Sequence, residues 1–479
     1  MRRHWFRFVP PGVAALALLA AADPAAPQEP VGPAAATLPI ERALIDAIAR
    51  AERSVVAIAR VYRPAPGEDP AAAGEDFRRL LEPDSPEYVP NDFATGVIVG
   101  PKQIVTNFHV LGHGDQSEYY VTTADRRVAR AKVVGADARI DLAVLQVEGI
   151  ELTPIAWGNS ATLRKGQIVV ALGNPYAIAR DGQVSASWGI VSNFGRKAPP
   201  ADAGRSSSAS AEKPTVHHYG TLIQTDARLN FGTSGGALID LEGRLVGLTT
   251  SIAALRGFET AAGYAIPVDE LFRRAVESLG KGEEVEYGFL GVAPRALPNA
   301  ARLAGLHGVE VDRTIPGTPA AGKFEPTDVI THVEDRPVYD ADGLVLEVAR
   351  RPADAEVQLT VLRRGTGQPQ QVPLRLAKAR VSGERVITAP RPAWRGLQVE
   401  FATALLAAGE LPAEPAVVVA AVEPDSAAAR AGLQRGQAIR AVNGRAIGTP
   451  AEFRAAVDGA AGVVTLETVT GDSLEVAAP

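Results

Sequence analysis

The chain has 479 residues, which at ~150 residues per domain suggests about three domains. Its composition, 46% hydrophobic and 22% charged residues, excludes a chain that is disordered throughout. The formal net charge of −6 argues against a general nucleic-acid binder, because such a protein needs a basic face to neutralise phosphates. The absence of cysteine excludes disulfides, thiolate metal sites and a cysteine nucleophile.

The N-terminus has the pattern of an export signal. Three arginines in the first seven residues precede an apolar run over residues 12–22, which is shorter than the ~20 residues that span a bilayer. The run ends in small residues that suit a signal-peptide cleavage site. We expect residues 1–22 to be a signal peptide and residues 23–36, rich in Ala and Pro, to be a flexible leader. This predicts a soluble protein of the periplasm or cell-envelope space, with an uncleaved N-terminal anchor as the alternative.

The next region has the pattern of an all-β domain. A short helix is predicted from Thr37, and then many short apolar runs separated by Gly, Asn and Asp indicate a barrel or sandwich. Two polar insertions, at 63–91 and 196–216, interrupt these runs, and loops of this length are usually functional or mobile. A helix over 267–279 closes the domain, which we place at 37–280.

The rest of the chain contains an internal duplication. The segment from Thr314 resembles the segment from Ala421. Pro316 and Pro424 are 108 residues apart, and Ile330 and Ile439 are 109 residues apart, so the two copies differ by a gap of one residue. Each copy continues with a helix, near 343–351 and 450–457, and a terminal hairpin. The second helix has an N-cap, a first-turn proline and a capping-box glutamate in Thr449-Pro450-Ala451-Glu452. The two units are placed at 285–380 and 394–479, with linkers near 280–286 and 380–392.

The strongest local motif for chemistry is Asn-Phe-Gly-Thr-Ser-Gly-Gly around Ser234. A serine hydroxyl attacks a carbonyl only if a base takes its proton and donors stabilise the oxyanion, and the glycines let the N–H groups of Gly232 and Ser234 converge. A Gly-rich turn with an ordinary serine explains the motif as well. The nucleophile elbow of α/β-hydrolases needs a helix after the serine, whereas the residues after Ser234 alternate around Glu242-Gly243 and predict a hairpin.

A base and an acid can be chosen by position. His109 lies at the end of the apolar segment QIVTNFHV, where a rigid strand could aim it, and Asp141 opens the apolar segment DLAVLQV. Taken singly, each is explained as well by packing or by a strand start. Together with Ser234 they follow the order His–Asp–Ser of chymotrypsin-type proteases. His217 and His218 lie at the end of the second insertion and have no assigned role.

These motifs give the sequence a resemblance to a known family. The segments TNFHV, ARIDLAVLQV, ALGNP, QTDARLNFGTSGGALIDLEGRLVGL and AGYAIPVDEL are similar to those of the HtrA/Deg (DegP-like) family of exported trypsin-like serine proteases with two PDZ domains. The resemblance covers nearly all of the chain after the signal. It implies a mainly β fold, in which a chymotrypsin-like double β-barrel protease domain precedes two PDZ-like α+β domains.

The resemblance also implies roles for individual residues. His109 is the general base, Asp141 fixes its tautomer, and Ser234 is the nucleophile, with an oxyanion hole formed by the backbone of Gly232, Thr233 and Ser234. The implied specificity pocket, for a small-to-medium apolar residue, contains Arg228, Leu229, Thr249 and Ile252. The implied carboxylate-binding loops of the PDZ units are Gly288, Phe289, Leu290 and Gly291, and Arg395, Gly396, Leu397 and Gln398.

Several positions depart from the family pattern. Thr233 replaces the usual Asn, and Arg228 replaces a small or apolar residue. The Gly-Asp pair of the PDZ loop is Thr327-Asp328 in the first unit and Gly436-Gln437 in the second.

The sequence therefore predicts an ATP-independent serine endopeptidase that degrades misfolded or damaged exported proteins, with PDZ units that capture peptide C-termini. The chain contains neither G-x-x-x-x-G-K-[ST] nor H-E-x-x-H, so no nucleotide, metal or other cofactor is expected. The resemblance implies a homotrimer or higher homo-oligomer, and no nucleic-acid partner is expected. The alternative is a protease-inactive PDZ-containing chaperone or scaffold.

Overall fold

The structure is a computed structural model that describes residues 33–62, 92–112, 117–174, 182–198, 215–230, 232–250, 262–364, 367–380 and 383–478. The chain divides into two units, Met1–Ala43 and Leu44–Pro479. The predicted signal peptide and most of the leader and of both insertions lie outside the described residues. Among the helices that are described, none combines the length and apolar character needed to cross a membrane.

The first helix begins earlier than the sequence predicts. Helix α1 spans Pro33–Ala51, whereas the sequence pattern predicts a start at Thr37. The three residues after Pro33 are alanines, the strongest helix formers, and proline is well tolerated in a first helical turn.

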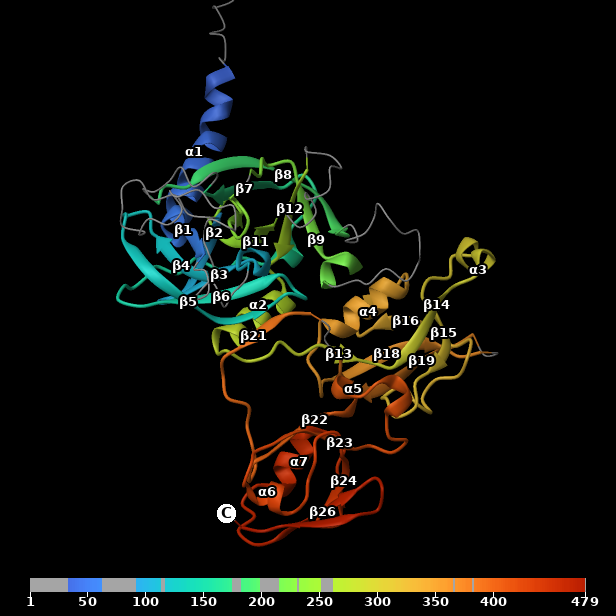
Figure 1. The fold of residues 1–479 in the computed structure, drawn as a ribbon. Helices are drawn as coiled ribbons and strands as arrows, with labels where there is room; N and C mark the ends of the chain where they lie inside the picture. The colour runs from blue at the N-terminus through green and yellow to red at the C-terminus, as the bar shows by residue number, and fades with distance from the viewer. Residues whose placement is uncertain are drawn as a thin grey trace, which may run out of the picture. The chain divides into compact units, whose positions relative to one another are not determined.

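The first β-barrel is formed by six antiparallel strands. Its strands are β1 (Val55–Tyr62), β2 (Asp92–Gly100), β3 (Gln103–Thr106), β4 (Ser117–Thr122), β5 (Val128–Asp137) and β6 (Leu142–Val147). They follow the order β5-β4-β1-β2-β3-β6, and pairing of β5 with β6 closes the sheet (Figure 1). Val, Ile and Ala side chains from these strands fill the interior, so the predicted β-rich domain is confirmed as a barrel.

The second barrel also closes with six strands. These are β7 (Ile168–Gly173), β8 (Ser185–Arg196), β9 (Leu222–Thr225), β10 (Ala237–Ile239), β11 (Leu245–Thr250) and β12 (Gly263–Pro267), in the order β10-β11-β12-β9-β8-β7. Strands β10 and β11 pair antiparallel directly after Ser234. The predicted hairpin is therefore confirmed, and the nucleophile-elbow alternative is excluded by the structure.

Helix α2 (Glu270–Gly280) follows the second barrel. Asp269 caps it by accepting a hydrogen bond from the N–H of Phe272, so the helix begins three residues later than predicted. The helix packs against β5 and β6 of the first barrel. A side chain at Gly135 on β5 would come within 2.6 Å of the carbonyl oxygen of Leu279, which explains the glycine at this close approach.

The two repeated units share one topology. The first sheet has the order β14-β15-β16-β18-β19 with β17 beside β16, and the second has β22-β23-β24-β26-β27 with β25 beside β24. Their bounds are β14 (Val292–Ala296), β15 (Val309–Thr314), β16 (Val329–Val333), β17 (Arg336–Pro337), β18 (Glu356–Leu362), β19 (Pro369–Arg375), β22 (Leu397–Phe401), β23 (Val417–Val422), β24 (Ala438–Val442), β25 (Arg445–Ala446), β26 (Val464–Thr468) and β27 (Ser473–Val476). This agreement confirms the duplication at the level of the fold.

The main helices of the two units lie close to their predicted positions. They are α4 (Ala341–Ala349), capped by Asp340, and α7 (Pro450–Val457). The capping box of α7 is confirmed, because Thr449 accepts from the N–H of Glu452 and the Glu452 carboxylate accepts from the N–H of Thr449. Short helices complete the units: α3 (Asn299–Leu303), α5 (Ala402–Leu405), α6 (Ala427–Arg430) and the 3₁₀ helix η8 (Ala408–Glu410).

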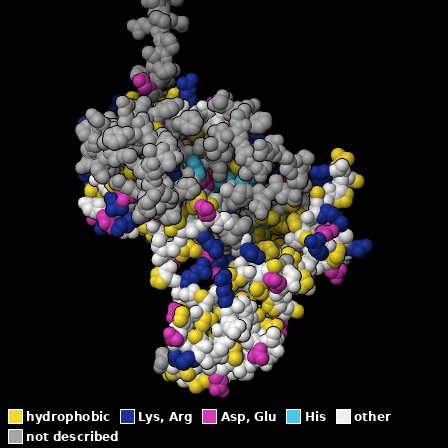
Figure 2. Space-filling model, viewed as in Figure 1, with side chains coloured by type: hydrophobic (Ala, Val, Ile, Leu, Met, Phe, Trp, Pro, Cys, Tyr) yellow, Lys and Arg dark blue, Asp and Glu magenta, His cyan; other side chains and the backbone are white. Residues whose placement is uncertain are grey.

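Three short strands at the ends of the first repeated unit and in the linker after it were not predicted from the sequence. Strand β13 (Gly288–Phe289) pairs with β20 (Ala377–Lys378) within the unit, and β21 (Arg385–Ile387) in the linker pairs with β5 of the first barrel (Figure 1). A protease domain that ends at residue 280 therefore lacks one strand of its own first sheet. On the face shown in Figure 2, acidic and basic side chains are interspersed over the described surface.

Candidate active site

The predicted base and acid are in direct contact. The Nδ1 atom of His109 lies 2.9 Å from Oδ1 and 3.0 Å from Oδ2 of Asp141, and the backbone N–H of His109 donates to Oδ1 at 3.0 Å. A carboxylate only accepts, so Nδ1 carries the proton and the lone pair of a neutral ring lies on Nε2. The His109 side chain is 32% exposed and that of Asp141 3%, so the histidine is partly accessible while its partner is buried.

The environment of His109 has opposing effects on its pKa. Burial is the largest single influence and lowers the pKa, but the charge of Asp141 and its hydrogen bond raise it, and the net result lies above the ordinary value of 6.5. Asp141 thus stabilises the imidazolium that forms when a histidine takes a proton.

Neither residue lies on a strand. Strand β3 ends at Thr106, and His109 is in the 3₁₀ helix η3 (Phe108–Val110), which corrects the prediction that it ends a strand. Asp141 precedes β6 with φ of 52°, in the left-handed region that aspartate tolerates better than most residues. Asn107 Nδ2 donates to the carbonyl of Asp141 at 3.2 Å, and this hydrogen bond fixes the peptide bond between Asp141 and Leu142.

The loop of Ser234 requires its glycines. Gly232 and Gly235 have φ of 90° and 80°. A side chain on Gly235 would come within 2.1 Å of the carbonyl oxygen of Thr95, and one on Gly236 within 2.4 Å of the carbonyl oxygen of Leu172. The loop is therefore pressed against both barrels, and only glycine fits at these positions.

The N–H of Thr233 has another partner. It donates to the carbonyl of Asn230 at 3.1 Å, and the Thr233 hydroxyl donates to the same oxygen at 2.7 Å. This turn corrects the expectation that the Thr233 backbone contributes to an oxyanion hole, and leaves Gly232 and Ser234 as the candidate donors.

Thr95 on β2 holds the Ser234 loop and was missed by the sequence analysis. Its N–H donates to the carbonyl of Ser234 at 2.9 Å, and its hydroxyl donates to the carbonyl of Gly232 at 2.7 Å. Its hydroxyl also accepts from the N–H of Asn174 at 2.8 Å, and its carbonyl accepts from the Thr106 hydroxyl at 2.8 Å. All its polar groups are paired, and the residue is fully buried.

Two consecutive threonines at the end of β11 connect the acid with the nucleophile loop. The carbonyl of Thr249 accepts from the N–H of Gly235 at 2.9 Å, and the Thr249 hydroxyl donates to the carbonyl of Thr233 at 2.6 Å. The hydroxyl of Thr250 donates to Oδ2 of Asp141 at 3.1 Å. The second barrel thus positions Ser234 and also contacts the acid supplied by the first barrel. Thr250 has no sequence signal of its own, because its partner lies 109 residues away.

The predicted specificity residues are only partly together. Arg228 and Leu229 line a cavity of about 190 Å³ with Asn230, Thr233 and Ser187. Thr249 is buried, and its hydroxyl is directed to the nucleophile loop, which corrects its assignment to the substrate pocket. Ile252 lies outside the described residues.

The two predicted carboxylate loops differ. In the second unit, Arg395 and Leu397 line a groove of about 690 Å³ together with Val399 of β22 and with Phe453 and Val457 of α7. In the same segment, Gly396 has φ of 81°, and Gln398 pairs with Ala421 of β23.

In the first unit, Gly288 and Phe289 form β13, and the N–H of Gly288 donates to the carbonyl of Arg351 at 2.7 Å. The carbonyls of Leu290 and Gly291 accept from the N–H groups of Ala320 and Ile315. Part of the first predicted loop is thus used in internal pairing.

Comparison with known proteins places this geometry in a family. Residues 94–248 match the family described as trypsin-like peptidase domain, and residues 418–470 match the PDZ domain family. The periplasmic serine endoprotease DegP of Salmonella typhimurium is 31% identical over 388 residues, which cover 79% of this chain and 74% of that protein. The periplasmic pH-dependent serine endoprotease DegQ of Escherichia coli is 29% identical over 410 residues, 83% of each chain.

Among solved structures, one described as HtrA-type protease AlgW with decapeptide is 28% identical, covers 70% of this chain and 98% of that chain, and has a TM-score of 0.48. The identity with DegP extends over most of both chains. The chain belongs to the HtrA/DegP family of trypsin-like serine endoproteases and carries a PDZ domain.

Proposed function

We propose that this chain is an ATP-independent serine endopeptidase that cuts misfolded or damaged exported proteins through an acyl-enzyme. His109 takes the proton of the Ser234 hydroxyl as that oxygen attacks the scissile carbonyl. The backbone N–H groups of Gly232 and Ser234 stabilise the oxyanion, and His109 then gives the proton to the leaving amine. Water, deprotonated by the same histidine, hydrolyses the ester that remains on Ser234.

The observation that carries this proposal is the contact of His109 Nδ1 with both oxygens of the Asp141 carboxylate. It fixes the tautomer in which Nδ1 carries the proton and Nε2 carries the lone pair of a base. The carboxylate is buried and accepts a further hydrogen bond from the hydroxyl of Thr250. A chaperone or scaffold has no use for a buried carboxylate that orients a partly exposed imidazole.

The repeated units capture peptide C-termini in this proposal, and both are PDZ domains. The groove beside α7 in the second unit supports the role, because a peptide could add to β22 and place apolar side chains against Phe453 and Val457. In the protease domain, Arg228 and Leu229 form part of the wall of the specificity pocket. The protein acts in the periplasm or cell envelope after removal of residues 1–22, as a homotrimer or higher homo-oligomer.

The test is labelling of the purified protein with a fluorophosphonate probe, which forms a covalent bond with an activated serine. Wild type is compared with Ser234→Ala and Asp141→Asn, each with and without a peptide that ends in a hydrophobic C-terminus. We expect labelling of wild type, none of Ser234→Ala, and slow labelling of Asp141→Asn. Stimulation by the peptide supports capture by the PDZ units. Folded wild-type protein that is not labelled under either condition contradicts the enzymatic proposal.

A further inference from the structure

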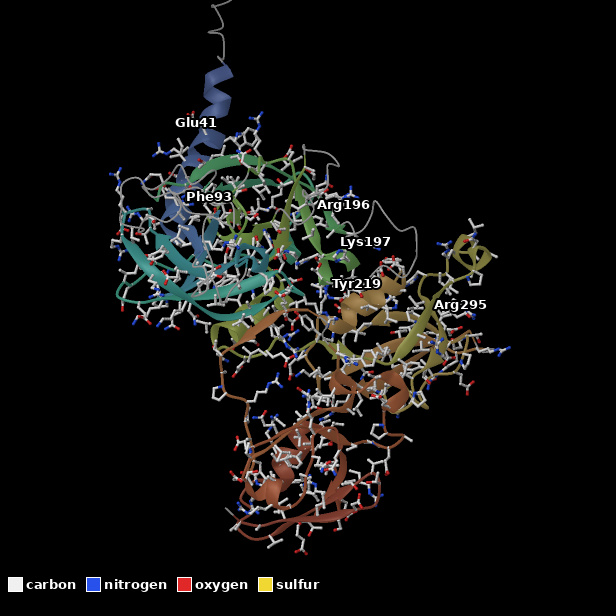
Figure 3. All side chains as sticks on the ribbon, in the orientation of Figure 1. Glu41, Phe93, Arg196, Lys197, Tyr219 and Arg295 are labelled. Carbon is white, nitrogen blue, oxygen red and sulfur yellow. The ribbon has the colours of Figure 1, made fainter. Side chains whose placement is uncertain are left out.

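His217 is a buried histidine next to the active site that the proposed chemistry does not use. It lies in the 3₁₀ helix η7 (Val216–Tyr219), whose last residue, Tyr219, is labelled in Figure 3. The side chain is 1% exposed, so both ring nitrogens need partners within the protein. Nε2 lies 2.9 Å from the carbonyl oxygen of Ile140, and Nδ1 lies 2.6 Å from the hydroxyl of Thr221.

These partners fix the proton on the ring. The carbonyl of Ile140 can only accept, so Nε2–H is the donor, and Nδ1 accepts from the Thr221 hydroxyl. Burial, the largest influence, lowers the pKa of His217, against smaller opposing effects of the Ile140 carbonyl and the Asp141 charge. The ring is therefore neutral, with one donor and one acceptor that match its two neighbours.

The carbonyl that His217 holds belongs to the peptide bond before Asp141. The N–H of Val216 donates to the carbonyl of Arg139 at 2.7 Å, so η7 holds two consecutive carbonyls of this turn. Asn107 holds the peptide on the other side of Asp141. Both peptide planes around a residue with φ of 52° are thus fixed by side chains, and the direction of its carboxylate follows from them.

We propose that His217 is a positioning residue of the catalytic triad, which holds the Ile140–Asp141 peptide so that the Asp141 carboxylate faces His109. The inference rests on the proposed role of Asp141 as the acid of the triad. Without the donor on His217, the buried carbonyl of Ile140 is unpaired, and the peptide rotates to find a partner. Asp141 then relaxes from its left-handed conformation, and His109 loses its orientation while Ser234 stays in place.

The experiment compares two amides at position 217. The amide nitrogen of His217→Gln extends about as far from the backbone as Nε2 does and reaches the Ile140 carbonyl. The shorter side chain of His217→Asn reaches only the position of Nδ1, near Thr221. The matched control is His218→Asn, because His218 is 6% exposed and its Nδ1 contacts Thr215 of its own segment.

We expect His217→Asn to lower kcat for a fluorogenic peptide by about 10- to 100-fold, the size of effect that a displacement of about 1 Å produces. KM changes little, because the residue does not contact substrate. His217→Gln restores most of kcat, and His218→Asn retains it. The downfield proton resonance of His109 Nδ1–H in its bond with Asp141 shifts in His217→Asn and stays in place in His217→Gln.

Two outcomes overturn the inference. Wild-type kcat in a folded His217→Asn protein does so, and so does an equal loss in the Gln and Asn variants, which indicates packing alone. If His217→Asn does not fold, His217→Phe replaces it, because a phenyl ring keeps the flat shape of the imidazole but has no donor for the carbonyl of Ile140. Asp141→Asn separates the two proposals: if it keeps full activity, the triad assignment itself fails.

Discussion

At the residue scale, the contact between His109 and Asp141 determines the response to pH. The charge of Asp141 and its hydrogen bond outweigh burial, so the pKa of His109 lies above 6.5. The base must be neutral to accept a proton, so we expect the acid limb of a kcat/KM profile to have its midpoint above that value. The stabilisation of the folded state by the ion pair is fully present below pH 6.5 and is lost as the pH rises through the raised pKa.

Two measurements check this prediction. A pH profile of kcat/KM with a fluorogenic peptide gives the midpoint, and titration of His109 by NMR in the Ser234→Ala protein gives the pKa directly. A pKa at or below the ordinary histidine value contradicts the expectation that Asp141 outweighs burial.

Thr95 gives a second prediction at this scale. Thr95→Val keeps the shape of the side chain on β2 but leaves the carbonyl of Gly232 and the N–H of Asn174 without the hydroxyl. The Ser234 loop is then free to shift, and we expect kcat to fall by about 10- to 100-fold. Thr95→Ser keeps the hydroxyl and is expected to retain most of kcat. Equal activity in both variants would show that the hydroxyl does not position the loop.

Thr327 in the first repeated unit gives a prediction about stability. This β-branched residue has φ of 76°, and its buried hydroxyl has no partner among the described residues. The equivalent residue in the second unit is Gly436, with φ of 89°. We expect Thr327→Gly to stabilise the first unit by about 1 kcal/mol or more, and Gly436→Thr to destabilise the second. Thermal unfolding of both variants in the Ser234→Ala background measures these changes in stability. A lower Tm for Thr327→Gly would show that the left-handed backbone of Thr327 is not strained.

At the scale of elements, the packing of α2 on the first barrel depends on Gly135. The three atoms nearest to a methyl group there are backbone atoms of Leu279, which cannot move aside without moving the helix. We expect Gly135→Ala to lower the free energy of unfolding by about 1–3 kcal/mol. Gly462→Ala is the control, because no atom lies within 4 Å of its added methyl group. Denaturant unfolding with equal midpoints for the two variants would contradict the close approach.

Some elements could be predicted from local pattern, and others could not. The hairpin after Ser234 and the capping box at Thr449 depend on neighbouring residues, and both are confirmed. The start of α2 and the 3₁₀ turn at His109 differ from the prediction, because caps and short turns are decided by single hydrogen bonds.

The contacts that hold the candidate site were not predictable from the sequence. Thr95 acts on residues 137 positions away, and His217 on a residue 77 positions away, and neither pair shares a local motif. The sequence around His217 indicates no role for it, because its neighbours in the chain are residues of a loop insertion. The role proposed for His217 can be inferred only from the structure, in which the turn that contains Ile140 contacts it.

At the scale of the molecule, the protease extends beyond the boundary predicted at residue 280. Strand β21 pairs with β5, and the hydroxyl of Tyr287 donates to the buried carboxylate of Asp137 at 3.0 Å. We compare two shortened Ser234→Ala chains, residues 37–280 and residues 37–392, by thermal unfolding of the protease part. The shorter chain is expected to have a Tm lower by at least about 2–4 °C, the shift for ~1 kcal/mol in a domain of this size. Equal Tm values would show that the added strand contributes nothing.

Strand β21 also affects the order in which the molecule can be assembled. Thr388, which follows it, contacts Val134 from 254 positions further along the chain. A polypeptide that emerges from its N-terminus can fold its early segments first, but this edge of the barrel stays open until the whole first repeated unit has been made. During synthesis, the protease therefore reaches its finished form only when the unit that follows it is already present, and a chain arrested before that point remains incomplete.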